Sequence, residues 1–280
     1  MNYLKLTDGR QLAWHEWGAA DGRVVVFCPG AGMAGRFAFG EKDAEELNLR
    51  IISVDRAGLG GSDADPQKNF ASWTNDIEQL LTHLKAEAPL AMGFSQGAAF
   101  AYALASANLV KGLAIVSGQD ELSYPATIKQ LPEQVAMMVE RAGSDALALE
   151  AEIAQFATAD WLWQMIETMS AEQDRVYYSR GDFAPHYRAA LKAGFLQGAA
   201  GYARDTILAM APWPFRLEDV RCPVQLWYGL SDTSPVHSPD FGKILNARLP
   251  SAKLNQVADA GSAILWSHSR EILMQLVASS

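Results

Sequence analysis

The chain has 280 residues, of which 49% are hydrophobic, and its formal net charge is −9 at pH 7. That length suits one α/β domain with an insertion, and the acidic balance argues against nucleic acid or an anionic membrane as a partner. Two cysteines, Cys28 and Cys222, are too few for a disulfide framework. Because the sequence shows neither a signal peptide nor a membrane-spanning apolar run, a reduced, cytoplasmic protein is expected.

The first 120 residues alternate between strand and helix patterns. Residues 2–17 alternate around a turn and predict a β-hairpin, and the continuous apolar runs at 23–28 and 50–54 predict strands buried on both faces. Further strands are expected at 88–92 and 111–117, and helices at 37–48, 70–86 and 98–107. This alternation indicates βαβ units, and therefore a parallel sheet with right-handed crossovers.

The alternation stops after Gly118. Residues 121–210 show helical spacing without a clear strand and are rich in methionine and aromatic residues. We expect them to form a helical cap over the carboxyl edge of the sheet, with residues 1–120 and 211–280 as the core. In the second part of the core, strands are expected at 223–228 and 252–257, and helices at 239–248 and 267–277. The predicted sheet then has eight strands.

A nucleophile motif follows the strand expected at 88–92. The run Gly93-Phe94-Ser95-Gln96-Gly97 has the form G-x-S-x-G and leads into an alanine-rich helix. A serine at the tip of so sharp a turn sits in strained backbone, so its neighbours two positions away must lack bulk. The context of strand, turn and helix favours a nucleophile elbow over a glycine-rich turn with an incidental serine.

Three landmarks together resemble the α/β-hydrolase fold superfamily: the loop Pro29-Gly30-Ala31-Gly32, the elbow at Ser95, and Gly229-Leu230-Ser231-Asp232 after a strand. The stretches 55–62, 214–232 and 259–273 also look like motifs of this superfamily. The resemblance covers nearly the whole chain. It implies a mostly parallel eight-stranded sheet flanked by helices, with a helical cap, but it implies no substrate, because this fold hosts many chemistries.

The resemblance also implies roles for individual residues. Ser95 would be the nucleophile and Asp232 the acid, with Asp120 as a backup acid. The N–H groups of Ala31 and Gln96 would form the oxyanion hole. The substrate pocket is expected at Gly30, Gly32, Trp161 and Trp163.

The base is where the sequence departs from the superfamily. Ser262 stands where the family pattern has histidine, and serine cannot accept a proton near neutral pH. The chain could be an engineered variant, a natural member that lost hydrolysis, or a protein in which another histidine substitutes. Of the five histidines, His237 and His268 are the candidates for substitution, whereas His15 and His83 are expected to be structural or solvated and His186 lies in the cap.

The predicted function is a serine hydrolase acting on a small apolar ester, amide or lactone, impaired because Ser262 replaces the base. The alternatives are a non-catalytic protein that binds or senses a small apolar ligand, and a cofactor-free perhydrolase or C–C hydrolase. The sequence contains no spacing typical of a metal site and no phosphate-binding loop, so no metal and no cofactor are expected. It does not indicate an oligomeric state.

Overall fold

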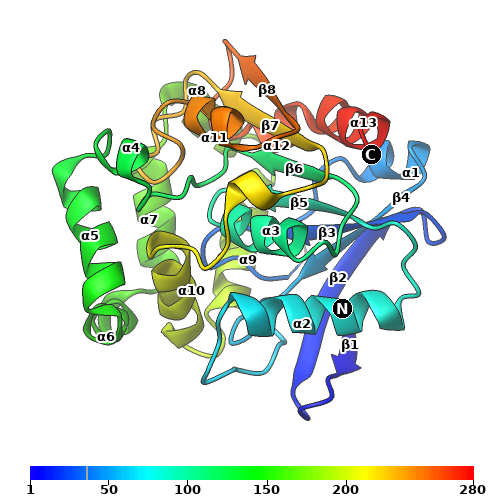
Figure 1. Ribbon diagram of the computed structural model, residues 1–280, viewed down its shortest axis with the longest axis horizontal. Helices are drawn as coiled ribbons and strands as arrows, with labels where there is room; N and C mark the ends of the chain where they lie inside the picture. The colour runs from blue at the N-terminus through cyan, green and yellow to red at the C-terminus, as the bar shows by residue number, and fades with distance from the viewer. Residues whose placement is uncertain (36) are drawn as a thin grey trace.

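A twisted eight-stranded sheet forms the centre of the protein in the computed structural model, which describes residues 1–35 and 37–280 (Figure 1). The strands lie in the order β1-β2-β4-β3-β5-β6-β7-β8. β1 and β2 pair antiparallel with each other and β2 with β4, whereas all other pairs are parallel. The predicted fold class is confirmed. The strands are β1 (Asn2–Lys5), β2 (Gln11–Gly18), β3 (Arg23–Cys28), β4 (Leu49–Val54), β5 (Leu90–Phe94), β6 (Leu113–Val116), β7 (Val224–Gly229) and β8 (Ala252–Val257).

Helices cover both faces of the sheet. One face carries α1 (Glu41–Glu46), α12 (Ile264–Ser267) and α13 (Ser269–Ala278). The other carries α2 (Phe70–His83), α3 (Gly97–Ser106), α11 (Lys243–Arg248) and the 3₁₀ turn η1 (Leu217–Asp219). Successive residues of a strand point to opposite faces, so neighbours such as Val25 and Val26 contribute to two separate apolar clusters. The continuous apolar runs in the sequence follow from this burial on both sides.

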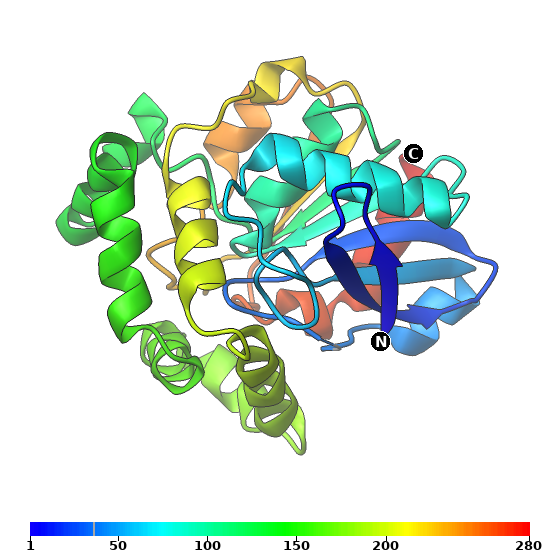
Figure 2. The ribbon, with the colours of Figure 1, turned by 90° about the horizontal axis from the view of Figure 1, so that it is seen from below.

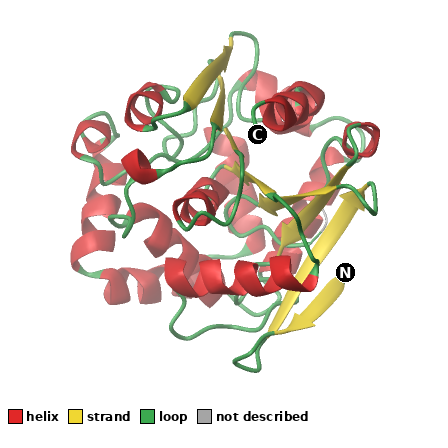
Figure 3. Ribbon diagram, turned by 45° about the vertical axis from the view of Figure 1, so that its right-hand side comes forward, coloured by secondary structure: helices red, strands yellow, loops and turns green. Residues whose placement is uncertain are grey.

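Seven helices occupy the segment between β6 and β7, and we call them the inserted helices. They are α4 (Pro125–Ile128), α5 (Glu133–Ser144), α6 (Ala146–Phe156), α7 (Ala159–Met169), α8 (Glu172–Tyr178), α9 (Phe183–Gly194) and α10 (Ala200–Met210). Figure 2 shows them gathered to one side of the sheet, and Figure 3 shows that helices and connecting loops build this side. Within the described part of the chain, no helix is long and apolar enough to cross a membrane.

Candidate active site

The turn at Ser95 has the strained geometry that the sequence predicts. Ser95 lies between β5 and α3 with a φ of 51°, in the left-handed region that residues with a Cβ rarely occupy. A Cβ on Gly93 would lie 2.8 Å from the Cα of Ala98, and one on Gly97 would overlap the backbone carbonyls of Cys28 and Pro29. Glycine is therefore required on both sides of the serine, because α3 packs directly against β5 and the loop after β3.

A chain of two hydrogen bonds joins Ser95 to an acid. Ser95 Oγ lies 2.8 Å from His237 Nε2, and His237 Nδ1 lies 2.6 Å from Asp232 Oδ2. A carboxylate can only accept, so Nδ1 carries the proton of this bond and Nε2 is left to accept from the serine hydroxyl. The side chains of His237 and Asp232 are only 8% and 4% exposed, which shields both bonds from water. This geometry is the one that a serine nucleophile, a histidine base and an orienting acid require.

The geometry places His237, and not position 262, against the hydroxyl of Ser95. Ser262 does not leave a gap: its N–H and its hydroxyl both donate to Asp174 Oδ2, at 2.8 and 3.0 Å, and its Oγ lies 3.0 Å from the Tyr178 hydroxyl. His237 lies against Ser95 instead, in the segment between β7 and α11, and the helix that the sequence places at 239–248 begins only at Lys243. The residues between β7 and α11 are thus free to fold back toward Ser95.

The remaining candidates lie away from the serine. His268 Nδ1 is hydrogen-bonded to Ser267 Oγ at 2.8 Å, and His83 and His186 are exposed. Asp120 accepts a hydrogen bond from Ser238 Oγ at 3.2 Å and makes none with His237, so it does not act as the orienting acid in this arrangement. Burial and the nearby Asp240 raise the pKa of Asp120 to about 7.

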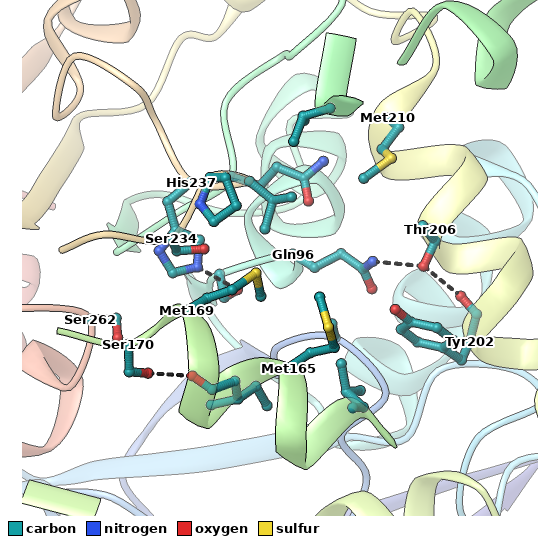
Figure 4. A pocket seen from close by; sticks show the side chains of 18 of the residues that line it. Gln96, Met165, Met169, Ser170, Tyr202, Thr206, Met210, Ser234, His237 and Ser262 are labelled. Atoms are coloured by element: carbon teal, nitrogen blue, oxygen red, sulfur yellow. Dashed lines mark hydrogen bonds between the residues drawn. The ribbon is translucent and has the colours of Figure 1, made fainter. Parts of the chain in front are cut away.

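Two backbone N–H groups are available beside Ser95. Ala31 and Gln96 both line the cavity that opens at the serine. Neither N–H has a hydrogen-bond acceptor among residues 1–35 and 37–280. The Gln96 side chain is held to one side, because its Nε2 donates to Thr206 Oγ1 at 3.2 Å (Figure 4). The positions predicted for the oxyanion donors therefore carry unpaired donors at the cavity wall.

The cavity has a volume of about 380 Å³ and is mainly apolar. Met165 and Met169 extend into it from α7, opposite Gln96 and His237 (Figure 4). No Asp, Glu, Lys or Arg side chain lines it in the part of the chain that the structure describes. The apolar lining comes mostly from the inserted helices and comprises Val135, Met138, Ile153, Phe156, Trp161, Leu162, Met165, Ile166, Met169, Tyr178, Tyr187, Tyr202 and Met210, with Ala31, Phe94 and Val236 from the core.

Of the four residues expected to form the pocket, the structure places Trp161 in the lining and the other three behind it. Trp163 is 5% exposed and packs edge to face on Tyr187, with ring centroids 5.5 Å apart. Gly30 faces Phe94 and Met33, and Gly32 lies under Leu162 and the aromatic rings beside it. Trp161 and Trp163 are two positions apart on α7, so they cannot share one helix face.

The sequence model of the Alpha/beta hydrolase family matches residues 25–274. The chain belongs to this family. A proline iminopeptidase of Arabidopsis thaliana is 34% identical over 118 residues, which are 40% of this chain. The match covers 31% of that protein, so the chain aligns with less than a third of the relative's length.

Solved structures of the same fold include three named proteins. An esterase from Exiguobacterium antarcticum has a TM-score of 0.69 at 17% identity, covering 99% of this chain and 98% of that one. An enol-lactonase from Burkholderia xenovorans has a TM-score of 0.69 at 16% identity, covering 99% and 100%. A putative non-heme bromoperoxidase from Mycobacterium tuberculosis has a TM-score of 0.70 at 18% identity, covering 100% and 98%. At these identities the likeness shows the fold of this alpha/beta hydrolase and not its substrate.

Proposed function

We propose that this alpha/beta hydrolase is a serine hydrolase that cleaves neutral, apolar carboxylic esters, lactones included, through an acyl-enzyme on Ser95. The hydrogen-bonded chain from Ser95 through His237 to Asp232 carries this proposal. A protein that only bound a ligand would have no need for a buried base aligned on a strained serine. His237 makes the contact that a base requires, which supports an active enzyme despite Ser262.

The reaction follows from the contacts. As Ser95 Oγ attacks the ester carbonyl, His237 Nε2 takes its proton, and Asp232 stabilises the imidazolium that forms. The carbonyl oxygen becomes negative and accepts from the N–H groups of Ala31 and Gln96. His237 then gives its proton to the departing alcohol. His237 then takes a proton from a water molecule, whose oxygen attacks the acyl carbon. In the collapse of this second tetrahedral intermediate the bond between Ser95 Oγ and the acyl carbon breaks, His237 returns the proton to Oγ, and the carboxylic acid leaves.

The cavity lining supports a neutral acyl group. A protonated amine placed there would lose its hydration without a carboxylate to compensate, because no acidic side chain lines the cavity within the described residues. We therefore propose neutral esters as substrates and not the activity in the name of the Arabidopsis relative. We propose that the inserted helices serve as a cap, since they supply most of the apolar wall.

Hydrolysis of p-nitrophenyl acetate, butyrate and octanoate tests the proposal, with L-proline p-nitroanilide as the charged comparison. We expect the two longer esters to be preferred, since each buried methylene contributes about 0.8 kcal/mol, and the anilide to be left intact. Ser95→Ala should reduce kcat about 10⁶-fold. Ser106→Ala, at the other end of α3, is the matched control and should keep the wild-type rate.

A fluorophosphonate probe gives a second readout of the same step. We expect it to add one phosphonyl group to the wild-type protein, on the peptide that contains Ser95, and none to Ser95→Ala. Ester hydrolysis that survives Ser95→Ala, or labelling at another residue, would rule out the acyl-enzyme on Ser95. Cleavage of the anilide with no ester activity would overturn the proposed substrate class.

A further inference from the structure

A fully buried ion cluster lies beside the candidate active site. Arg56 follows β4 and Asp205 lies on α10, and both side chains are 0% exposed. Arg56 Nε donates to Asp205 Oδ2 at 2.7 Å, and the ammonium of Lys68 pairs with Asp205 Oδ1. Removing three charges from water costs a great deal of free energy, and such clusters are seldom the most stable way to fill a core. The other hydrogen bonds of Arg56 indicate why this cluster is present.

The guanidinium of Arg56 also holds the loop after β3. Nη1 donates to the carbonyl of Pro29 at 2.6 Å, and Nη2 donates to the carbonyl of Gly30 at 3.1 Å. The Gly30 carbonyl accepts a second bond from Met33 N at 3.3 Å. The guanidinium also stacks on the Phe100 ring, with Cζ of Arg56 4.6 Å from the ring centroid, and this contact helps to fix its plane. The direction of the Gly30 carbonyl is thus fixed by two donors.

That direction decides where the Ala31 N–H points. The carbonyl of Gly30 and the N–H of Ala31 belong to one planar trans peptide unit, in which they point to opposite sides. With the carbonyl directed to Arg56 and Met33, the N–H is directed away from them, and Ala31 lies on the cavity wall beside Ser95. A flip of this peptide would replace a donor at the oxyanion by a carbonyl oxygen, which repels negative charge.

We propose that Arg56 is a positioning residue for the oxyanion hole, and that Asp205 on α10 keeps it in place. The inserted helices then act on the chemical step as well as on substrate access, because they supply the carboxylate that orients the guanidinium. The inference rests on the proposed function, since it requires an oxyanion at Ala31. Arg56 does not contact the reacting atoms and acts only through the Gly30–Ala31 peptide.

The test uses Arg56→Lys, Arg56→Met and Asp205→Asn, assayed with p-nitrophenyl butyrate. Arg56→Lys keeps the buried positive charge beside Asp205 but loses the planar guanidinium that reaches both carbonyls. It therefore tests the proposal even if Arg56→Met does not fold. We expect Arg56→Met to lower kcat about 10²-fold to 10³-fold, as loss of one oxyanion donor does, with KM within threefold of wild type. Arg56→Lys and Asp205→Asn should lower kcat at least about tenfold.

Binding of butylboronic acid supplies a readout that a merely structural role would not move. Its tetrahedral adduct with Ser95 places a negative oxygen at the oxyanion position, so its affinity should fall by the same factor as kcat in each variant. The matched control is Arg10→Met, which breaks another partly buried ion pair, with Asp76 at 2.7 Å. We expect it to lower the unfolding temperature and leave kcat and boronate affinity within threefold of wild type.

The outcomes separate the two proposals. If Arg56→Lys and Asp205→Asn are folded and keep kcat and boronate affinity within threefold of wild type, the positioning role is overturned and the proposed function stands. If KM rises and kcat is unchanged, Arg56 shapes the cavity and does not orient the donor, which also overturns the inference. Absence of Ser95-dependent hydrolysis in the wild type would instead overturn the proposed function and the inference together.

Discussion

Two loops that leave the carboxyl ends of neighbouring strands reach the same cavity but hold different chemistry. The loop after β7 carries both Asp232 and His237, five residues apart and joined by a hydrogen bond of 2.6 Å. The loop after β8 carries Ser262, whose N–H and hydroxyl are bound to Asp174 of an inserted helix. In the superfamily pattern the base belongs to the second loop. Here the histidine that contacts Ser95 comes from the first loop, and we propose that the fold fixes where the loops converge but not which of them supplies the base.

Backbone hydrogen bonds in the loop after β7 explain how Asp232 and His237 come together. Asp232 Oδ1 accepts from Ser234 N at 2.9 Å, which turns the chain back directly after the acid. Ser238 N donates to the carbonyl of Gly118 at 3.2 Å and anchors the far end of the loop beside β6. His237 lies between these two anchors, so its ring is fixed on both sides before its own hydrogen bonds are counted.

The largest difference between the two loops should appear when His237 and Ser262 are each replaced by alanine. His237→Ala should lower kcat for p-nitrophenyl butyrate about 10⁴-fold to 10⁶-fold, because the members of such a chain act as a unit. Ser262→Ala should change kcat less than about threefold, since a serine without a proton-transfer role is lost. Equal losses in the two variants would show that the distinction between the loops is wrong.

A double variant sharpens the result. His237→Ala combined with Ser262→His places a histidine only where the superfamily pattern has it. We expect no recovery, because Asp174 and Tyr178 occupy the space and hydrogen bonds around position 262 and Asp232 would have to turn toward it. Recovery of kcat to within about tenfold of wild type would show that either loop can carry the base.

The second loop is a structural connection, and its removal should be seen in stability. The Asp174 carboxylate accepts three hydrogen bonds, from the N–H and hydroxyl of Ser262 and from Ala263 N at 2.9 Å. Asp174→Ala leaves these buried donors unpaired, and we expect it to reduce the free energy of unfolding by about 3 kcal/mol. Urea denaturation measures this loss. Asp182→Ala, at an exposed position before α9, should stay within about 0.5 kcal/mol of wild type.

Short-range signals explain why the sheet and the elbow could be predicted from the sequence. Continuous apolar runs locate the strands, and G-x-S-x-G between strand and helix locates Ser95, because each depends only on neighbouring residues. The role of His237 depends on where α11 begins, and that start is delayed by Phe241 and Gly242, which have φ values of 57° and 86°. A stop of this kind has no periodicity to reveal it. An acid and a histidine in one loop after a buried strand were the available signal.

Contacts between distant segments explain the rest of what the sequence did not reveal. Asp174 meets Ser262 across 88 positions, and Arg56 meets Asp205 across 149. Each pair joins an inserted helix to a loop of the core, and the sequence of the inserted helices shows only spacing that predicts helix. From sequence alone, charged residues on such helices are expected to face solvent, and only the packing of the helix against the core shows otherwise.

The last effect we predict concerns the support beneath the loop after β7. Asp120 is buried and accepts a hydrogen bond from Ser238, the residue after His237. Burial, and to a smaller extent the nearby charge of Asp240, raises the pKa of Asp120 from 3.8 to about 7. A raised pKa means that the folded protein binds more protons than the unfolded chain between about pH 4 and 7. The free energy of unfolding should therefore fall as pH rises through that window, by up to about 1.4 kcal/mol per pH unit from this group.

Urea denaturation of the wild type and Asp120→Asn at pH 5, 6, 7 and 8 measures this contribution. Asparagine keeps an oxygen to accept from Ser238 but does not titrate, so the variant should lose most of the decline between pH 5 and 7 and be the more stable protein at pH 8. Asp182→Asn, at the exposed position before α9, is the control and should follow the wild-type profile. A decline that is identical in wild type and Asp120→Asn would show that other carboxylates cause it. In that case Asp120 supports the loop only through its hydrogen bond with Ser238.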